Sequence, residues 1–173
     1  MFNLAVFGRL KLWQTFLILS LSGLVLASIP SYLYMKEAGK ALGAYSNEQA
    51  GLPGVARVLK VIQTTQQHRG LSALYLGGVA GAEEKRSAKQ READDVYTEV
   101  GKIVAGIGDS SLDKLWSGAL GEWETLKAGV AAKSIAVPQS YAGHVSVLAK
   151  LLKVNEMIGD HFGLSLDPDK DTY

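Results

Sequence analysis

An uncharged, apolar run from Leu12 to Met35 constrains this chain more than any other feature. Between Lys11 and Lys36 no side chain carries a charge, and most are aliphatic or aromatic. A bilayer core about 30 Å thick needs about 20 apolar residues in a helix, so the run is long enough to cross it. A lone segment in hydrocarbon can satisfy its backbone polar groups only as a helix. The sequence therefore predicts a transmembrane helix over residues 12–35.

The same run could instead be the apolar core of a cleaved secretory signal. Arg9 and Lys11 precede it, and the segment 25–28 offers a small-residue cleavage site. Apolar residues continue beyond that segment to Met35, which favours an uncleaved anchor in contact with membrane lipid. Because basic residues precede the run, the positive-inside rule places residues 1–11 in the cytoplasm and exports the rest of the chain.

Composition limits what the exported part can be. The chain has 173 residues, so about 135 follow the anchor, enough for one small domain. The formal net charge is +1 and basic residues alternate with acidic ones, which gives no reason to expect nucleic acid as a partner. There is no cysteine, which excludes disulfides, thiol catalysis and thiolate metal sites.

Helical periodicity dominates the chain beyond the anchor, and no segment alternates with period two. We expect a stalk helix over residues 36–52 and a break at Gly51–Gly54. A helical domain then occupies residues 53–173, with a turn at Gly77–Gly81. Further helices are expected at Glu83–Ile107, in the segment after a cap at residues 109–111, and from a Ser140 cap through Tyr141–Phe162. The third segment carries the clearest repeat of four and three residues, at Leu112, Trp116, Ala119, Trp123, Leu126 and Val130.

These elements predict an all-α fold, with one N-terminal transmembrane helix followed by an up-and-down antiparallel helical bundle. The final residues Leu164–Asp169 look like the start of another helix, and the chain stops at Tyr173. We therefore expect the bundle to be incomplete at its C-terminus, as in a truncated product or a fragment of a longer protein.

Arg69 and Gln66 are the first candidates for a binding site. If Val55, Val58, Leu59 and Ile62 form the buried stripe, both side chains continue it. A buried guanidinium needs a carboxylate partner or a pocket that admits an anion. Arg69 could therefore form a structural ion pair with Asp160 or Asp167, or bind an anionic ligand. A third alternative is that the helix phase differs and Arg69 is solvated.

The remaining polar candidates lie on the last helix. His144 and Asn155 fall on its buried stripe, where they would be hydrogen-bonded core groups or ligand contacts. His68, His144 and His161 have no metal-ligand spacing, so we expect no metal and no haem or other cofactor. Trp116 and Trp123 are expected in the core.

Motifs of catalysis are missing from the chain. It carries no Gly-rich phosphate loop, nucleophile elbow, His-Glu-x-x-His zinc motif or kinase signature. The segment Asp167–Asp171 resembles the opening of a calcium loop but lacks the central Gly and the terminal Glu. We expect no enzyme activity.

Two stretches of the sequence stand out. Residues 63–73 are Gln-Thr-Thr-Gln-Gln-His-Arg-Gly-Leu-Ser-Ala, and residues 158–173 are Ile-Gly-Asp-His-Phe-Gly-Leu-Ser-Leu-Asp-Pro-Asp-Lys-Asp-Thr-Tyr. The first stretch resembles the Gln-x-x-Gln-x-His-Arg-Gly-Leu-Ser stretch in the periplasmic sensor region of bacterial methyl-accepting chemotaxis proteins. The second is similar to a segment before the final sensor helix of those receptors. Trp123 and residues 140–144 also fit, so the resemblance covers residues 51–173. Similar regions occur in transmembrane sensor kinases and diguanylate cyclases.

The resemblance implies a homodimeric inner-membrane receptor whose periplasmic bundle binds a small molecule and passes a helix displacement through the membrane. We expect the sensor portion of a chemoreceptor, with Gln66, Arg69, His144 and Asn155 as ligand contacts. A sensor kinase or cyclase could use the same input region. A stand-alone anchored helical protein with a structural or adaptor role is the other alternative.

Overall fold

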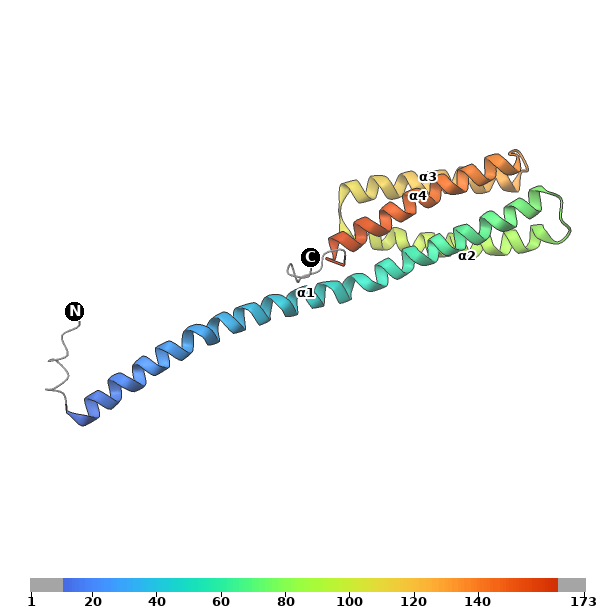
Figure 1. The fold of residues 1–173 in the computed structure, drawn as a ribbon. Coiled ribbons are helices and arrows are strands. Elements are labelled where there is room, and N and C mark those ends of the chain that lie inside the picture. Colours follow the sequence, from blue (N-terminus) through green and yellow to red (C-terminus); the bar gives the residue numbers. More distant parts are fainter. Residues whose placement is uncertain (1–10, 165–173) are drawn as a thin grey trace. The chain divides into compact units, whose positions relative to one another are not determined.

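The computed structural model describes residues 11–164, and these residues are almost entirely helical, without strands (Figure 1). This confirms the predicted all-α fold. They divide into two compact units between Tyr45 and Ser46. The helices are α1 (Leu12–Leu76), α2 (Ala82–Ile107), α3 (Ser110–Ala131) and α4 (Val137–His161).

The first unit consists of the N-terminal part of α1. Within the described residues, α1 alone is long and apolar enough to cross a membrane, with a mean hydropathy of 1.9 in its most apolar 18-residue window. Its large apolar side chains are exposed, among them Leu19 (64 %) and Leu26 (71 %). Leu and Ile side chains on every face of a helix are typical of a segment that meets lipid.

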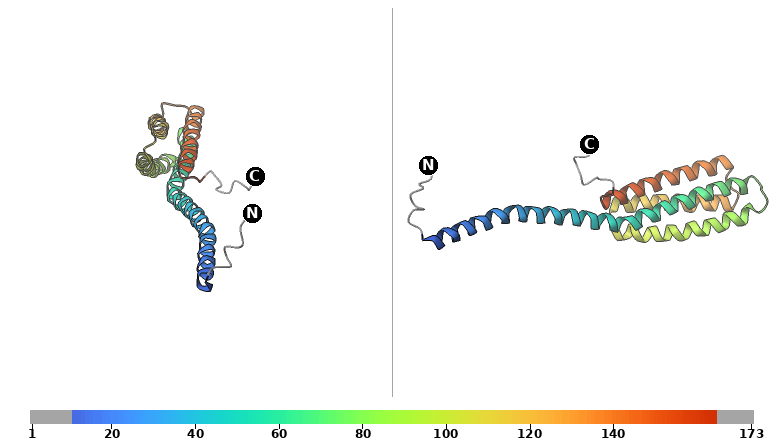
Figure 2. Two further views of the ribbon diagram at one scale, coloured as in Figure 1. Left: turned by 90° about the vertical axis from the view of Figure 1, so that its left-hand side faces the viewer. Right: turned by 60° about the horizontal axis from the view of Figure 1, so that its bottom comes forward.

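The second unit is an antiparallel bundle of the C-terminal part of α1 with α2, α3 and α4 (Figures 1 and 2). The connections 77–81 and 132–136 lie together at one end, which we call the two-loop end. The α2–α3 connection and the last turn of α4 lie at the opposite end. Gly78 and Gly81 adopt positive φ (80° and 74°) in the first connection, a conformation that glycine reaches at no steric cost.

The core of the bundle is a single cluster built from one seam on each helix. All six residues of the predicted α3 repeat are buried, and Trp123 and Val130 are fully inaccessible. On α4, His144 is buried as predicted, and Leu148 and Leu151 are buried on the same stripe. Burial follows the alternation of three and four residues because that spacing returns to the same side of a helix.

The phase predicted for α1 is right at Val58 and Ile62, which are buried, and wrong at Leu59, which is 50 % exposed. Gln66, predicted to continue the stripe, is exposed as well. Beyond Ile62 the buried side chains of α1 are polar at Thr64, Thr65, His68 and Ser72. The sequence pattern pointed to the aliphatic face because it could not recognise Thr, His and Ser as core residues. The buried side chains of this part of α1 are Val58, Val61, Ile62, Thr64, Thr65, His68, Ser72 and Tyr75.

The helix break predicted at Gly51–Gly54 is also wrong, because α1 continues through it and carries Pro53 within its length. Both glycines are buried. A Cβ at position 51 would overlap the Phe162 side chain, and one at position 54 would lie 3.4 Å from Ile158 Cγ2. The glycines therefore allow α1 and the end of α4 to pack closely.

Replacing Gly51 with alanine should lower the free energy of unfolding of the bundle by about 1–3 kcal/mol, because overpacking forces the Phe162 ring to move. The matched control is Gly121→Ala in α3, where nothing lies within 4 Å of the added methyl. That change should stabilise by about 0.5–1 kcal/mol through helix propensity. Urea denaturation of both variants measures the difference, and equal effects would contradict this packing.

The predicted helix cap is confirmed at the start of α3 and is wrong at the start of α4. Asp109 caps α3 as predicted, since its Oδ1 accepts hydrogen bonds from the backbone N–H groups of Ser111 (2.7 Å) and Leu112 (3.0 Å). Ser140, predicted as the cap of α4, instead lies buried inside it. The helix begins at Val137, and the preceding backbone N–H donates to Gln139 Oε1 (2.9 Å).

Candidate functional site

Trp123 lies at the centre of the bundle, and its indole packs against rings from the three other helices. It stacks on Tyr97 of α2, with centroids 5.1 Å apart and planes 6° apart, and it meets His68 of α1 edge to face at 4.9 Å. Its Nε1–H donates to Asp94 Oδ1 (2.8 Å), and Lys127 Nζ donates to the same oxygen (2.9 Å). The indole is thus hydrogen-bonded and its carboxylate partner is neutralised.

Beside Trp123, two histidines form a hydrogen-bonded pair that joins α1 to α4. His68 Nδ1 lies 2.9 Å from His144 Nε2, and both side chains are fully buried. His144 Nδ1 lies 2.7 Å from the carbonyl oxygen of Ser140, and Ser72 Oγ lies 3.3 Å from His68 Nδ1. This confirms the expectation that His144 is a hydrogen-bonded core residue.

Burial keeps this pair uncharged. It lowers the pKa of His68 to about 3, with smaller electrostatic contributions from His144, Arg86 and Lys127. Burial also lowers the pKa of His144, partly opposed by its hydrogen bond to the backbone of Ser140. Both imidazoles are therefore neutral near pH 7.

Arg86 on α2 is a buried cation that pairs with no carboxylate of residues 11–164. The residue is only 5 % exposed, and its Nε has no hydrogen-bond partner among the described residues. Its NH1 donates to Gln90 Oε1 (2.5 Å) and lies 3.5 Å from His68 Nε2, while its NH2 donates to Ser87 Oγ (2.9 Å). All these partners are neutral. None of the ion pairs among residues 11–164 includes Arg86.

Two further cations without an ion pair in the described chain lie near the two-loop end. Tyr75 has the Arg86 guanidinium 5.1 Å from its ring centroid and the Lys133 ammonium 4.4 Å from it. The guanidinium of Arg69, which is half-buried, lies 4.9 Å from the ring centroid of Tyr141. Aromatic faces partly compensate these charges, but they do not neutralise them.

The ion pair expected between Arg69 and Asp160 does not form. Arg69 lies level with Tyr141 near the start of α4, whereas Asp160 is exposed about 28 Å further along that helix. The antiparallel course of α1 and α4 separates the two residues. Asp167 lies outside the described residues.

The other predicted candidates are not brought together. Gln66 is exposed on α1, and Asn155 is half-buried about 16 Å along α4 from His144, with its Oδ1 buried and without a partner in the described chain. His161 is exposed against Phe162. Only Arg69 and His144, of the four predicted ligand contacts, lie in the same part of the bundle.

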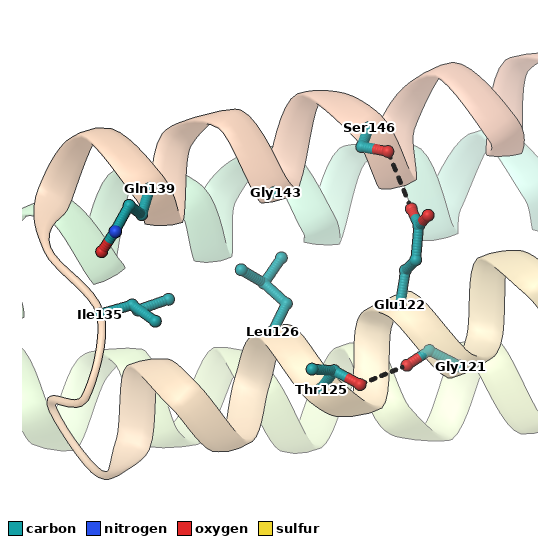
Figure 3. A pocket seen from close by; sticks show the side chains of 8 residues that line it. All are labelled: Gly121, Glu122, Thr125, Leu126, Ile135, Gln139, Gly143 and Ser146. Carbon is teal, nitrogen blue, oxygen red and sulfur yellow. Dashed lines mark hydrogen bonds between the residues drawn. The ribbon is translucent and has the colours of Figure 1, made fainter.

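One concave feature away from Arg86 is a groove of about 510 Å³ between α3 and α4 (Figure 3). Its floor is apolar, with Leu126 and Ile135. Its one carboxylate, Glu122, accepts hydrogen bonds from Ser146 (2.9 Å) and Lys150 (2.6 Å). This groove offers an anion no free cation, so it is a weaker candidate than the surroundings of Arg86.

Sequence reasoning missed Arg86 and the role of His68, although a signal for Arg86 was present. The α2 seam of Val100, Val96 and Ala93 extends backwards by three- and four-residue steps to Arg86. The charged first half of this helix concealed that extension. The sequence held no comparable signal for His68, because its pairing with His144 depends on α1 and α4 being neighbours in the bundle.

Comparison with known proteins adds one finding. A family model described as nitrate and nitrite sensing (NIT) matches residues 60–165, more than half of the chain. The match includes His68, Arg69, Arg86 and His144. No curated protein and no solved structure matches the chain.

Proposed function

The chain belongs to the nitrate and nitrite sensing family, and from this premise we propose that it is the periplasmic input region of an inner-membrane chemoreceptor responding to a small oxyanion. Domains of this family are extracytoplasmic sensing domains of membrane-anchored signalling proteins. Chemotaxis as the output, and nitrate or nitrite as the ligand, are our proposals.

The proposed topology follows from the N-terminal helix. Residues 12–35 would cross the inner membrane, with the N-terminus in the cytoplasm because Arg9 and Lys11 precede the span. The bundle would then lie in the periplasm, where nitrate and nitrite from outside the cell arrive first.

Arg86 is the observation that carries the choice of ligand. An uncompensated cation inside a protein is costly, and removing water from it is repaid only by an anion or by several strong hydrogen bonds. Its partners Gln90, Ser87 and His68 are neutral, and its Nε has none. A guanidinium presents a planar fork of donors that suits a planar oxyanion. Nitrate and nitrite have that shape.

Arg69 and Lys133 would assist from either side of this site. Neither forms an ion pair in the described chain, and both face aromatic rings near the two-loop end. Their charges would attract an anion into this end of the bundle, an effect that operates over about 8 Å at physiological ionic strength.

Signalling would not require catalysis by this chain. A ligand shifts a two-state equilibrium by its differential affinity for the two states. An anion on Arg86 of α2 would change the contacts of α2 with α1, the helix that enters the membrane. The resulting displacement of α1 would be transmitted across the membrane in a homodimer. The full reading frame of the gene distinguishes a chemoreceptor from a sensor kinase, a cyclase or an adaptor.

Binding of sodium nitrate to the full chain in lipid nanodiscs tests the ligand. Titration calorimetry at constant ionic strength should detect nitrate or nitrite binding that chloride does not reproduce. Arg86→Met, which removes the charge and preserves volume, should weaken binding at least about tenfold, the effect of losing a charge-assisted hydrogen bond.

The matched control is Arg57→Met, because Arg57 lies on α1 and pairs with Glu99 at the surface. Its nitrate affinity should equal that of the wild type. If neither anion binds, or if Arg86→Met binds as tightly as the wild type, the proposed site is wrong. If Arg69→Met loses nitrate binding and Arg86→Met does not, the anion binds at Arg69 and not at Arg86.

A further inference from the structure

Four ring nitrogens of the histidine pair form one continuous path through the bundle. It runs from Arg86 NH1 to His68 Nε2 (3.5 Å), from His68 Nδ1 to His144 Nε2 (2.9 Å), and from His144 Nδ1 to the carbonyl oxygen of Ser140 (2.7 Å). The path crosses from α2 through α1 to α4. Each step joins two atoms whose donor or acceptor role can be deduced.

The deduction starts at the backbone carbonyl, which only accepts. His144 Nδ1 must therefore carry the hydrogen, and in the neutral ring Nε2 keeps the lone pair. His68 Nδ1 must then be the donor to His144, which leaves His68 Nε2 with a lone pair. That lone pair faces the donor Arg86 NH1. Of the four nitrogens, His68 Nε2 alone can accept a proton without breaking a bond inside the pair.

We propose that binding of an oxyanion at Arg86 is coupled to uptake of one proton at His68 Nε2, so that the site binds anion and proton together. This inference rests on the proposed function. The buffer supplies the proton, which forms a new N–H bond on Nε2 and leaves the His68–His144 and His144–Ser140 hydrogen bonds in place. His68 then becomes a donor, so its Nε2–H and Arg86 can both donate to the same anion.

The charges around the pair explain why His68 Nε2 stays unprotonated until an anion binds. Arg86 from α2, Lys127 from α3, and Arg69 from α1 oppose a positive charge on the two imidazoles. Asp94 of α2 is occupied by Lys127 and by the Trp123 indole. The nearby phenol of Tyr97 is un-ionised, because burial raises its pKa. Without a ligand, none of the described groups that face the pair is a free negative charge.

An anion on Arg86 reverses this balance. It neutralises the guanidinium and presents oxygen atoms to His68 Nε2, so the protonated form gains a partner and loses a repulsion. By linkage, a ligand that raises the pKa of a group binds more tightly where that group is protonated. Affinity should therefore rise as the pH falls below the bound-state pKa, by up to about tenfold per pH unit.

The experiment is nitrate titration of the full chain in nanodiscs at pH 7.5, 6.5 and 5.5. At each pH two buffers with different ionisation enthalpies are used, which gives the number of protons taken up. Nitrate itself does not titrate in this range. We expect uptake of up to about one proton per nitrate and a dissociation constant at least about fivefold lower at pH 5.5 than at pH 7.5.

Two variants separate the histidine pair from other groups. His68→Gln should bind nitrate without proton uptake and without pH dependence. The matched control His161→Gln, at an exposed position, should behave as the wild type. Nitrate binding without proton uptake by the wild type overturns this inference alone, and requires no variant to fold. Loss of uptake in His161→Gln also overturns it. Absence of nitrate binding overturns the proposed function, and this inference with it.

Discussion

Replacing Trp123 with alanine is expected to lower the free energy of unfolding of the bundle by about 3–5 kcal/mol, the usual cost of deleting a buried tryptophan. The indole is fully inaccessible, and it packs against Tyr97 and His68. Its loss also removes the N–H that donates to Asp94. Because small domains are stable by about 5–15 kcal/mol, this loss would remove a large share of the stability of the bundle. Thermal melting followed by circular dichroism measures the effect.

Two variants test whether packing or the hydrogen bond dominates. Trp123→Phe keeps an aromatic ring in the core but loses the N–H donor and part of the ring volume, while Lys127 still neutralises Asp94. It should cost about 1–2 kcal/mol. Leu152→Ala on α4, at a side chain that is 57 % exposed, should change stability by less than about 0.5 kcal/mol. A Trp123→Ala bundle as stable as the Leu152→Ala bundle would show that Trp123 is not central.

Lowering the pH from 7.5 to 4.5, without nitrate or nitrite, should destabilise the bundle by about 3 kcal/mol through His68. Its pKa is about 3 when folded against 6.5 for an unperturbed imidazole, so the unfolded state binds more protons. Stability therefore falls as the pH drops below 6.5, by about 1.4 kcal/mol per unit, until about pH 3. His144, whose pKa is also lowered, adds in the same direction.

Carboxylates do not account for this window. Lys89 and Lys150 lower the pKa values of Glu92 and Glu122 through hydrogen bonds. The stability that these groups contribute is lost only below their unfolded pKa of 4.5. Urea denaturation at intervals of half a pH unit isolates the histidines, with His161→Gln as the control. A flat profile from pH 7.5 to 4.5 would mean that the buried pair is not held neutral.

Both predictions concern the same part of the core, because His68 contacts Trp123 and is also the group whose protonation destabilises the fold. A buried neutral histidine contributes to packing only while it stays uncharged. In the ligand-free bundle, acid therefore weakens the same core that Trp123 fills. An anion on Arg86 would reduce this acid sensitivity, which links the stability measurement to the proposed ligand.

Much of the fold was determined by the sequence alone. The uncharged stretch at residues 12–35 predicted a helix able to span a membrane, and the α3 repeat predicted six buried residues that the structure confirms. The Asp109 cap and the glycine turn at residues 77–81 were likewise local. Each depends on spacing or chemistry within a few residues, so no knowledge of neighbouring helices was needed.

Only the tertiary structure decided where the polar core lies. The α1 seam carries Thr65, His68 and Ser72, which look like surface residues until their partners on other helices are known. Arg86 likewise looked like one charge among many, and its lack of an ion pair within residues 11–164 became visible only in the structure. A hydrophobic stripe is a property of one helix, whereas the satisfaction of a buried polar group is a property of all the helices that surround it.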